Sequence, residues 1–130
     1  MKILVGYRGI NVGKDLLELA VQHAKAFAGE VLLITSLPGG EKTSKEQVVE
    51  AEEALEQAKQ FLADRDIKHE AHLLVRGKTP GEDLVSFAAD NNCNEIIIGV
   101  KSRSKVGKIL FGSTAQYVII KASCPVVSVK

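Results

Sequence analysis

The stretch that decides the fold is Glu95–Lys121, EIIIGVKSRSKVGKILFGSTAQYVIIK. It begins with a β-branched apolar run that ends at Gly99, a pattern typical of a buried strand. A basic segment follows and leads to Gly112, Ser113 and Thr114, which open an apolar helix. Free backbone N–H groups and the helix dipole both favour an anion at a helix N-terminus. The stretch therefore predicts a phosphate site.

The basic segment between the strand and the helix has a second interpretation. Its cationic side chains are Lys101, Arg103, Lys105 and Lys108. A solvated loop could carry the same charges, with glycines that only permit turns. Composition alone leaves both interpretations open.

Length and composition set the broad class of the protein. The chain has 130 residues, which suits one domain over residues 1–130, and 45% of them are hydrophobic, so a core can form without disulfides or a metal. A formal net charge of +1 gives no global field for nucleic acid or a membrane surface. No signal-peptide pattern follows Met1 and no apolar run is long enough to span a membrane. We therefore expect a cytoplasmic protein.

Four further segments have the short apolar pattern of strands: Lys2–Tyr7, Glu30–Ser36, His69–Arg76 and Pro125–Val129. The third begins with polar residues, which favours a position near a sheet edge. Apolar residues at three- and four-residue spacings lie between all the strands and predict helical connections. Right-handed crossovers then give an α/β fold, a doubly wound five-stranded parallel sheet in the order 3-2-1-4-5 with helices on both faces.

Local signals indicate where the helices begin and end. We expect Gly29 to end the first helix in the left-handed conformation. Ser44 and Gln47 form a capping-box pattern before the second helix, and Thr79-Pro80-Gly81-Glu82 has the pattern of a third helix start. The fourth helix should end before Cys124, because the residue before a proline disfavours the helical region.

Several familiar sites can be excluded. Gly77-Lys78-Thr79 resembles the end of a Walker A loop, but His72 stands where the leading glycine must be, and no GxGxxG follows the first strand. His69 and His72 point to opposite faces of a strand and so make no metal pair. Cys93 and Cys124 form no CxxC motif. No grouping of catalytic residues is readable, so an enzymatic activity has no support from the sequence.

The strand order also predicts where a ligand binds. In doubly wound sheets, ligands lie beyond the carboxyl ends of the strands, where the strand order reverses. Here the reversal falls between the first and fourth strands. It brings the segment Gly6–Gly9 beside the segment Gly99–Ser102.

The basic segment resembles a known nucleotide motif. Gly99-x-x-Ser102, nine residues and then Gly112-Ser113 is similar to the motif G-x2-G-x9-G-[ST] of the universal stress protein family. The opening ILV strand, Gly77-x-x-Pro80 and the segment Cys124–Val127 also resemble that family. The resemblance implies a small cytoplasmic Rossmann-like protein, usually a homodimer, which is expressed under stress and binds ATP or AMP when it has the motif.

The resemblance also implies roles for particular residues. Gly99, Lys101 and Ser102 would contact the ribose and the phosphates, and the start of the following helix would cradle phosphate. Arg8 stands where the family usually has an aspartate that helps hold the nucleotide, and Ser102 replaces the second glycine of the motif. The full set of expected nucleotide-binding residues is Gly6, Tyr7, Arg8, Ser36, Gly99, Lys101, Ser102, Gly112, Ser113 and Thr114.

Three functional hypotheses follow. In the first, ATP (with Mg2+) or AMP changes the basic segment and thereby the binding of an unidentified protein partner. The second is a nucleotide-free dimeric interaction module of the same fold. The third is a slow ATP hydrolase, for which no general base or metal-binding carboxylate is identifiable. We also expect a homodimer through the final strand, Pro125–Val129, because it lies at a sheet edge.

Overall fold

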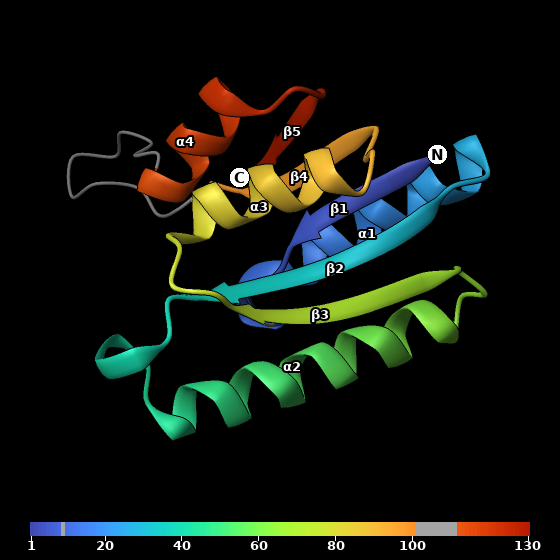
Figure 1. Ribbon diagram of the computed structural model, residues 1–130. Coiled ribbons are helices and arrows are strands. Elements are labelled where there is room, and N and C mark those ends of the chain that lie inside the picture. Colours follow the sequence, from blue (N-terminus) through green and yellow to red (C-terminus); the bar gives the residue numbers. More distant parts are fainter. Residues whose placement is uncertain (9, 101–111) are drawn as a thin grey trace, which may run out of the picture.

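Strands and helices alternate along the whole chain, as the sequence predicts (Figure 1). The computed structural model describes residues 1–8, 10–100 and 112–130. The elements are β1 (Lys2–Gly6), α1 (Ile10–Phe27), β2 (Glu30–Leu37), the 3-10 turn η1 (Gly40–Lys42), α2 (Lys45–Ala63), β3 (His69–Val75), α3 (Pro80–Asp90), β4 (Glu95–Gly99), α4 (Ser113–Lys121) and β5 (Val126–Val129).

The five strands form one sheet in the order β3-β2-β1-β4-β5, and every pairing is parallel. This confirms the expected doubly wound order and the position of β3 at an edge. The register places Val5 of β1 opposite both Leu33 of β2 and Ile97 of β4. All carboxyl ends consequently share one side of the sheet, which lies to the left in Figure 1. We call this side, where all five strands end, the carboxyl edge. It is distinct from the two lateral edges of the sheet, which are formed by β3 and β5.

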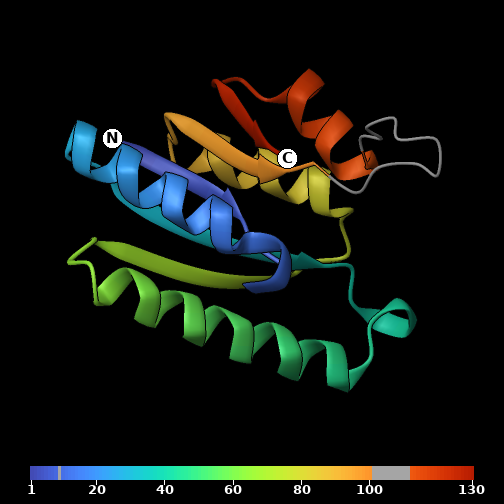
Figure 2. The ribbon, with the colours of Figure 1, turned by 180° about the vertical axis from the view of Figure 1, so that it is seen from behind.

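Two apolar clusters hold the helices on opposite faces of the sheet. Ile3 and Val5 pack with side chains of α1 and α2, whereas Leu4 packs with side chains of α3 and α4. In Figure 1, α3 and α4 lie in front of the sheet, and in Figure 2, which shows the molecule from behind, α1 lies in front. Ile3, Leu4 and Val5 are inaccessible to solvent, so β1 is the centre of both clusters.

Two helix starts follow the sequence signals. Ser44 caps α2 with its hydroxyl, which accepts a hydrogen bond from the Gln47 N–H at 3.1 Å, and the Gln47 side chain accepts one from the Ser44 N–H at 2.8 Å. The predicted capping box is confirmed. Thr79 caps α3, and Pro80 is its first residue. The C-cap of α4 is Ala122, so the expected end before Cys124 is also confirmed.

The expectation for Gly29 was wrong. Ala28, with φ of 50°, takes the left-handed conformation at the end of α1, although a glycine follows it. A Cβ atom on Gly29 would lie 2.9 Å from the Met1 carbonyl oxygen. Glycine is therefore required there because the backbone of the N-terminal segment approaches closely, and the local strain falls on the alanine.

Within residues 1–8, 10–100 and 112–130, no helix combines the length and the apolar character that crossing a bilayer requires.

Truncation of the core should be costly. Leu17 on α1 is fully buried against the sheet, whereas Val49 on α2 is half exposed. We expect Leu17→Ala to lower the free energy of unfolding by about 2–5 kcal/mol, because it removes buried methyl groups and leaves a cavity. Val49→Ala should change it by no more than about 0.5 kcal/mol. Urea denaturation measures both, and equal effects of the two variants would contradict the packing described here.

Candidate functional site

The carboxyl ends of β1 and β4 lie beside each other, where the strand order reverses. Gly6 ends β1 and Gly99 ends β4, and the two strands pair directly. The chain leaves β1 towards α1 on one face and leaves β4 towards α4 on the other. Such a divergence is where doubly wound proteins bind ligands. The structure thus brings Gly6 and Gly99 to the same place at the carboxyl edge.

Gly6 also has a packing role. A Cβ atom at this position would lie 3.1 Å from Leu84 Cδ1 on α3 and 3.4 Å from Ile98 Cγ2 on β4. The missing side chain therefore lets the start of α3 pack closely on the end of β1.

Tyr7 lies in the core, although it follows β1 directly. Its side chain is only 1% exposed. Its ring packs against the backbone of Gly13 so closely that a Cβ atom added to this glycine would lie 2.5 Å from Tyr7 Cε1. The Tyr7 carbonyl oxygen accepts a hydrogen bond from Thr35 Oγ1 at 2.7 Å, and its N–H donates to the Ile34 carbonyl at 2.9 Å. Burial raises the pKa of the Tyr7 hydroxyl, which has no partner among the described residues. The phenol is thus neutral and packed beneath α1.

A buried carboxylate connects three elements at the carboxyl edge. Asp83, in the first turn of α3, is fully buried. Its Oδ2 accepts a hydrogen bond from Ser36 Oγ at 2.8 Å, and its Oδ1 accepts one from Arg76 Nε at 2.8 Å and a second, short one from Arg76 Nη2. The side chain of Ser36, an expected nucleotide-binding residue, is therefore engaged by Asp83. We call Ser36, Asp83 and Arg76 the Asp83 cluster.

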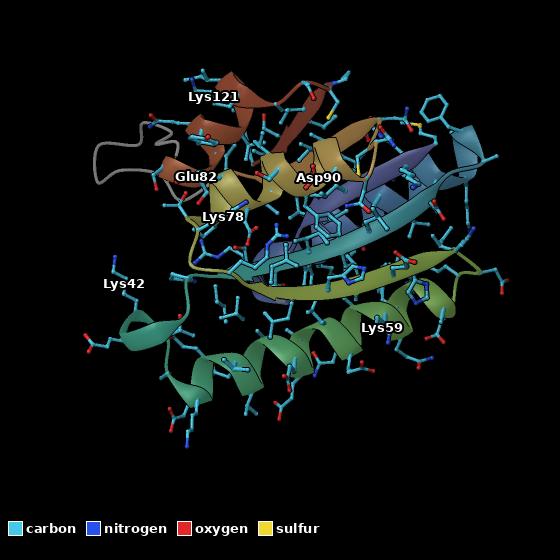
Figure 3. The ribbon with its side chains drawn as sticks, in the orientation of Figure 1. Lys42, Lys59, Lys78, Glu82, Asp90 and Lys121 are labelled. Carbon is cyan, nitrogen blue, oxygen red and sulfur yellow. The ribbon has the colours of Figure 1, made fainter. Side chains whose placement is uncertain are left out.

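The Asp83 cluster lies at the start of α3. Lys78 and Glu82, labelled in Figure 3, project from this start at the end of the molecule towards which β1 and β2 point. Among the described residues, Arg8 makes no ion pair, and its side chain is exposed. Arg8, Arg76 and Lys78 stand against the carboxylates of Asp83 and Glu82 at this end of the sheet, an excess of one cation among these five residues.

The start of α4 carries the other part of the expected site. Gly112 is the N-cap residue, with φ of −67° and ψ of 162°, and no side chain caps the helix. Ser113 is exposed and Thr114 is half-buried in the first turn. Backbone N–H groups at such a start can therefore bind an anion. Lys101 and Ser102, together with the other basic residues of the segment, lie outside the described residues.

Sequence reasoning missed Asp83 and Arg76. Asp83 looks like an ordinary acidic residue in the first turn of a helix, where the helix dipole alone explains it. Its seven-residue separation from Arg76 has no motif meaning, and the contact arises because β3 and α3 are joined by a short turn. The one signal available in the sequence was that Asp83 directly precedes Leu84, an apolar core position.

The remaining polar groups of the described residues do not gather into a metal site. In the described part of the chain, no three His, Cys, Asp or Glu side chains are placed to hold a metal ion. His69 Nδ1 lies 2.7 Å from the Ile67 carbonyl oxygen, and His72 packs against Phe87 and Glu70. The two histidines are therefore used separately, as the alternation along a strand predicts.

The model of the universal stress protein family matches residues 1–130. The chain belongs to this family. A universal stress protein from Archaeoglobus fulgidus has a TM-score of 0.93 at 38% identity, with 100% of this chain and 98% of that chain covered. The structure of the universal stress protein from Archaeoglobus fulgidus in complex with dAMP gives 0.86 at 35% identity, with the same coverage. Universal stress protein MJ0531 of Methanocaldococcus jannaschii is 29% identical over 140 residues, which cover 99% of this chain and 81% of that protein.

The cysteines of this universal stress protein should react slowly. Burial raises the pKa of the Cys93 thiol to about 11, and the neighbouring Cys124 contributes to the shift. The thiolate is the reactive form, so we expect Cys93 at pH 8 to be alkylated by iodoacetamide about 100-fold more slowly in the folded protein than in guanidinium. Peptide mapping by mass spectrometry gives the rate at each cysteine. Equal rates in the two states would contradict the burial of this thiol.

Proposed function

We propose that this universal stress protein binds an adenine nucleotide, AMP or ATP, at the carboxyl edge between β1 and β4. The observation that carries the proposal is the dAMP complex of the Archaeoglobus fulgidus relative, which is 35% identical and matches all of this chain. The same fold places Gly6, Gly99 and the start of α4 at one edge of the sheet here. A ligand at that edge can reach both parts of the site.

The start of α4 suits the phosphate end of the nucleotide. Gly112 presents no side chain at the N-cap, so the backbone can approach phosphate oxygens closely. Ser113 and Thr114 add hydroxyl groups in the same turn, and the helix dipole favours the negative charge. These features support phosphate binding by either AMP or ATP.

The buried carboxylate at this edge, Asp83, does not suit Mg2+. Asp83 already accepts hydrogen bonds on both oxygens, from Ser36 and from Arg76. If ATP is the ligand, we infer that Mg2+ is held by the phosphates and by water. This leaves AMP and ATP as equal candidates for the phosphate site.

The proposed role is regulatory and cytoplasmic. We infer that occupancy by the nucleotide is communicated to a protein partner through the basic segment between β4 and α4. In the sequence, that segment joins Gly99 at the end of β4 to Gly112 at the start of α4, two parts of the proposed site. A ligand that binds one conformation of a protein more tightly than another shifts the population towards the first conformation.

Nucleotide binding is tested by calorimetry with AMP and with ATP. We expect heat of binding from the wild-type protein and none from Gly112→Val, because the added side chain obstructs close approach of the backbone to phosphate. Ser123→Val serves as a control, since it changes an exposed residue at the opposite end of α4. Absence of heat from the wild type at millimolar ligand would overturn the proposal, as would full affinity in a folded Gly112→Val protein.

We further propose a homodimer through β5. This strand lies at the sheet edge, beyond β4. The carbonyl groups of Pro125 and Val129 accept hydrogen bonds from the N–H groups of Ile96 in β4 and of Val100, which directly follows β4. Because backbone groups alternate in direction along a strand, the N–H groups of Val126 and Ser128 point away from β4. They can pair with the same strand of a second copy and give a closed twofold dimer.

The alternation identifies the substitution that tests the dimer. Ser128→Pro removes an outward N–H group and should convert the dimer to a monomer, while the β4–β5 pairing remains. Ser128→Ala keeps the N–H group and is the matched control. Light scattering at micromolar protein measures the mass. A monomeric wild type, or a dimer that is unchanged in Ser128→Pro, would refute pairing through β5.

A further inference from the structure

We propose that Arg76 contacts the nucleoside part of the bound nucleotide, and that Asp83 is the positioning residue that holds Arg76 there. The proposal rests on the proposed function, because it assumes a nucleotide at the carboxyl edge. The start of α4 can bind only the phosphate, and Arg76 would bind the remaining part of the nucleotide. The contact would be made by guanidinium N–H groups to neutral acceptor atoms, either ring nitrogens of the base or hydroxyl oxygens of the ribose.

Asp83 holds the side chain of Arg76 in one orientation. Its Nε and Nη2 groups both donate to Asp83 Oδ1, and the carboxylate itself is held by Ser36 and by its place in the first turn of α3. A planar guanidinium bound through two of its nitrogens has a fixed plane. Nη1 has no partner among the described residues, and the side chain is 39% exposed. Donor groups therefore remain for a ligand.

Contacts with β2 and α3 set the location of the Arg76 guanidinium. Arg76 follows β3, and the turn after it is fixed by a hydrogen bond of 3.0 Å from the Gly77 N–H to the Pro38 carbonyl. Because Asp83 also binds Ser36 near the end of β2, the guanidinium lies over the end of that strand. Leu84, the next residue on α3, packs against Gly6 at the end of β1. Arg76 thus lies at the end of β2, the strand next to β1 on the side away from β4.

A nucleotide bound by its phosphate at the start of α4 would extend towards the Asp83 cluster. With its phosphate at the start of α4, on the β4 side, the nucleoside has room towards β1 and β2 along the same edge. The Asp83 cluster occupies that end of the edge. A guanidinium held at this point meets the nucleoside and not the phosphate.

Stability alone gives a weak reason for such a cluster. The Asp83 carboxylate loses its hydration on burial while Arg76 keeps part of its own, and apolar side chains of similar volume often stabilise a fold as well as a buried charge and its partner. What the pair adds is a cation in one orientation at a surface where ligands bind. That property serves recognition, since a pre-oriented donor loses little freedom when a ligand arrives.

The test compares two probes on matched variants. Arg76→Lys keeps a positive charge for Asp83 but removes the planar donor group, so we expect the dissociation constant for AMP to rise about tenfold, the loss of one charge-assisted hydrogen bond. Binding of inorganic phosphate, measured by NMR titration, should change by less than about twofold because the start of α4 is untouched. Arg65→Lys is the control, since Arg65 lies over the Phe61 ring beyond the end of α2.

Ribose 5-phosphate separates the two acceptor sources. Equal weakening of AMP and ribose 5-phosphate by Arg76→Lys assigns the contact to the ribose, and weakening of AMP alone assigns it to the base. Either result supports the proposal. Weakening of inorganic phosphate to the same extent as AMP would overturn it, because a loss shared by a ligand that has no nucleoside places the effect of Arg76 at the phosphate.

The positioning role of Asp83 is tested by a double-mutant cycle. Asp83→Asn should weaken AMP binding, and combining it with Arg76→Lys should add little further loss, because both changes disturb one contact. Additive losses would refute the positioning role. If Arg76→Lys leaves AMP affinity unchanged while the wild type binds AMP, the Arg76 contact is wrong and the proposed function stands. If the wild type binds no nucleotide, both are wrong.

Discussion

The pairing of β1 with β2 on one side and β4 on the other is the constraint on which this structure depends. The strand is short and lies in the middle of the sheet, and its central residues Ile3, Leu4 and Val5 are inaccessible to solvent. Successive side chains of a strand face opposite sides, so β1 contributes to both apolar clusters at once. Because β2 and β3 lie on one side of β1 and β4 and β5 lie on the other, the reversal of strand order falls between β1 and β4. The same constraint that builds the core therefore places the candidate site.

Much of this fold could be predicted because its signals are local. A continuous apolar run such as Val31–Ile34 can be satisfied only in a strand covered on both faces, and helical connections between such strands impose the parallel order. The caps at Ser44 and Thr79 are equally local, since they use side chains within three residues. Ala28 shows where such reasoning fails. The close approach of the Met1 backbone, distant in sequence, decided which residue took the strained conformation.

The candidate site was less predictable, since its geometry depends on contacts between separate elements. The expected strand order indicated that Gly6 and Gly99 would lie beside each other, and the structure places both at the carboxyl edge. It could not indicate that Tyr7 turns into the core or that Ser36 donates to Asp83 across 47 residues. The pair of His23 and Glu95, with 2.6 Å between Nδ1 and Oε1, is a similar case at the opposite edge of the sheet. Polar partners of this kind have no sequence period.

The two edges of the sheet use polar groups in different ways. At the amino edge, the Asn94 side chain accepts a hydrogen bond from the Lys2 N–H at 2.8 Å, and Glu95 meets His23, so polar groups there connect elements to one another. At the carboxyl edge, Asp83 is satisfied while Arg76 and Arg8 keep donors directed to solvent. A buried carboxylate with all its partners contributes order at little net gain in stability. Asp83 lies at the carboxyl ends of β2 and β3, on the side of the sheet where doubly wound proteins bind ligands, so the orientation that it imposes on Arg76 is consistent with the proposed recognition role.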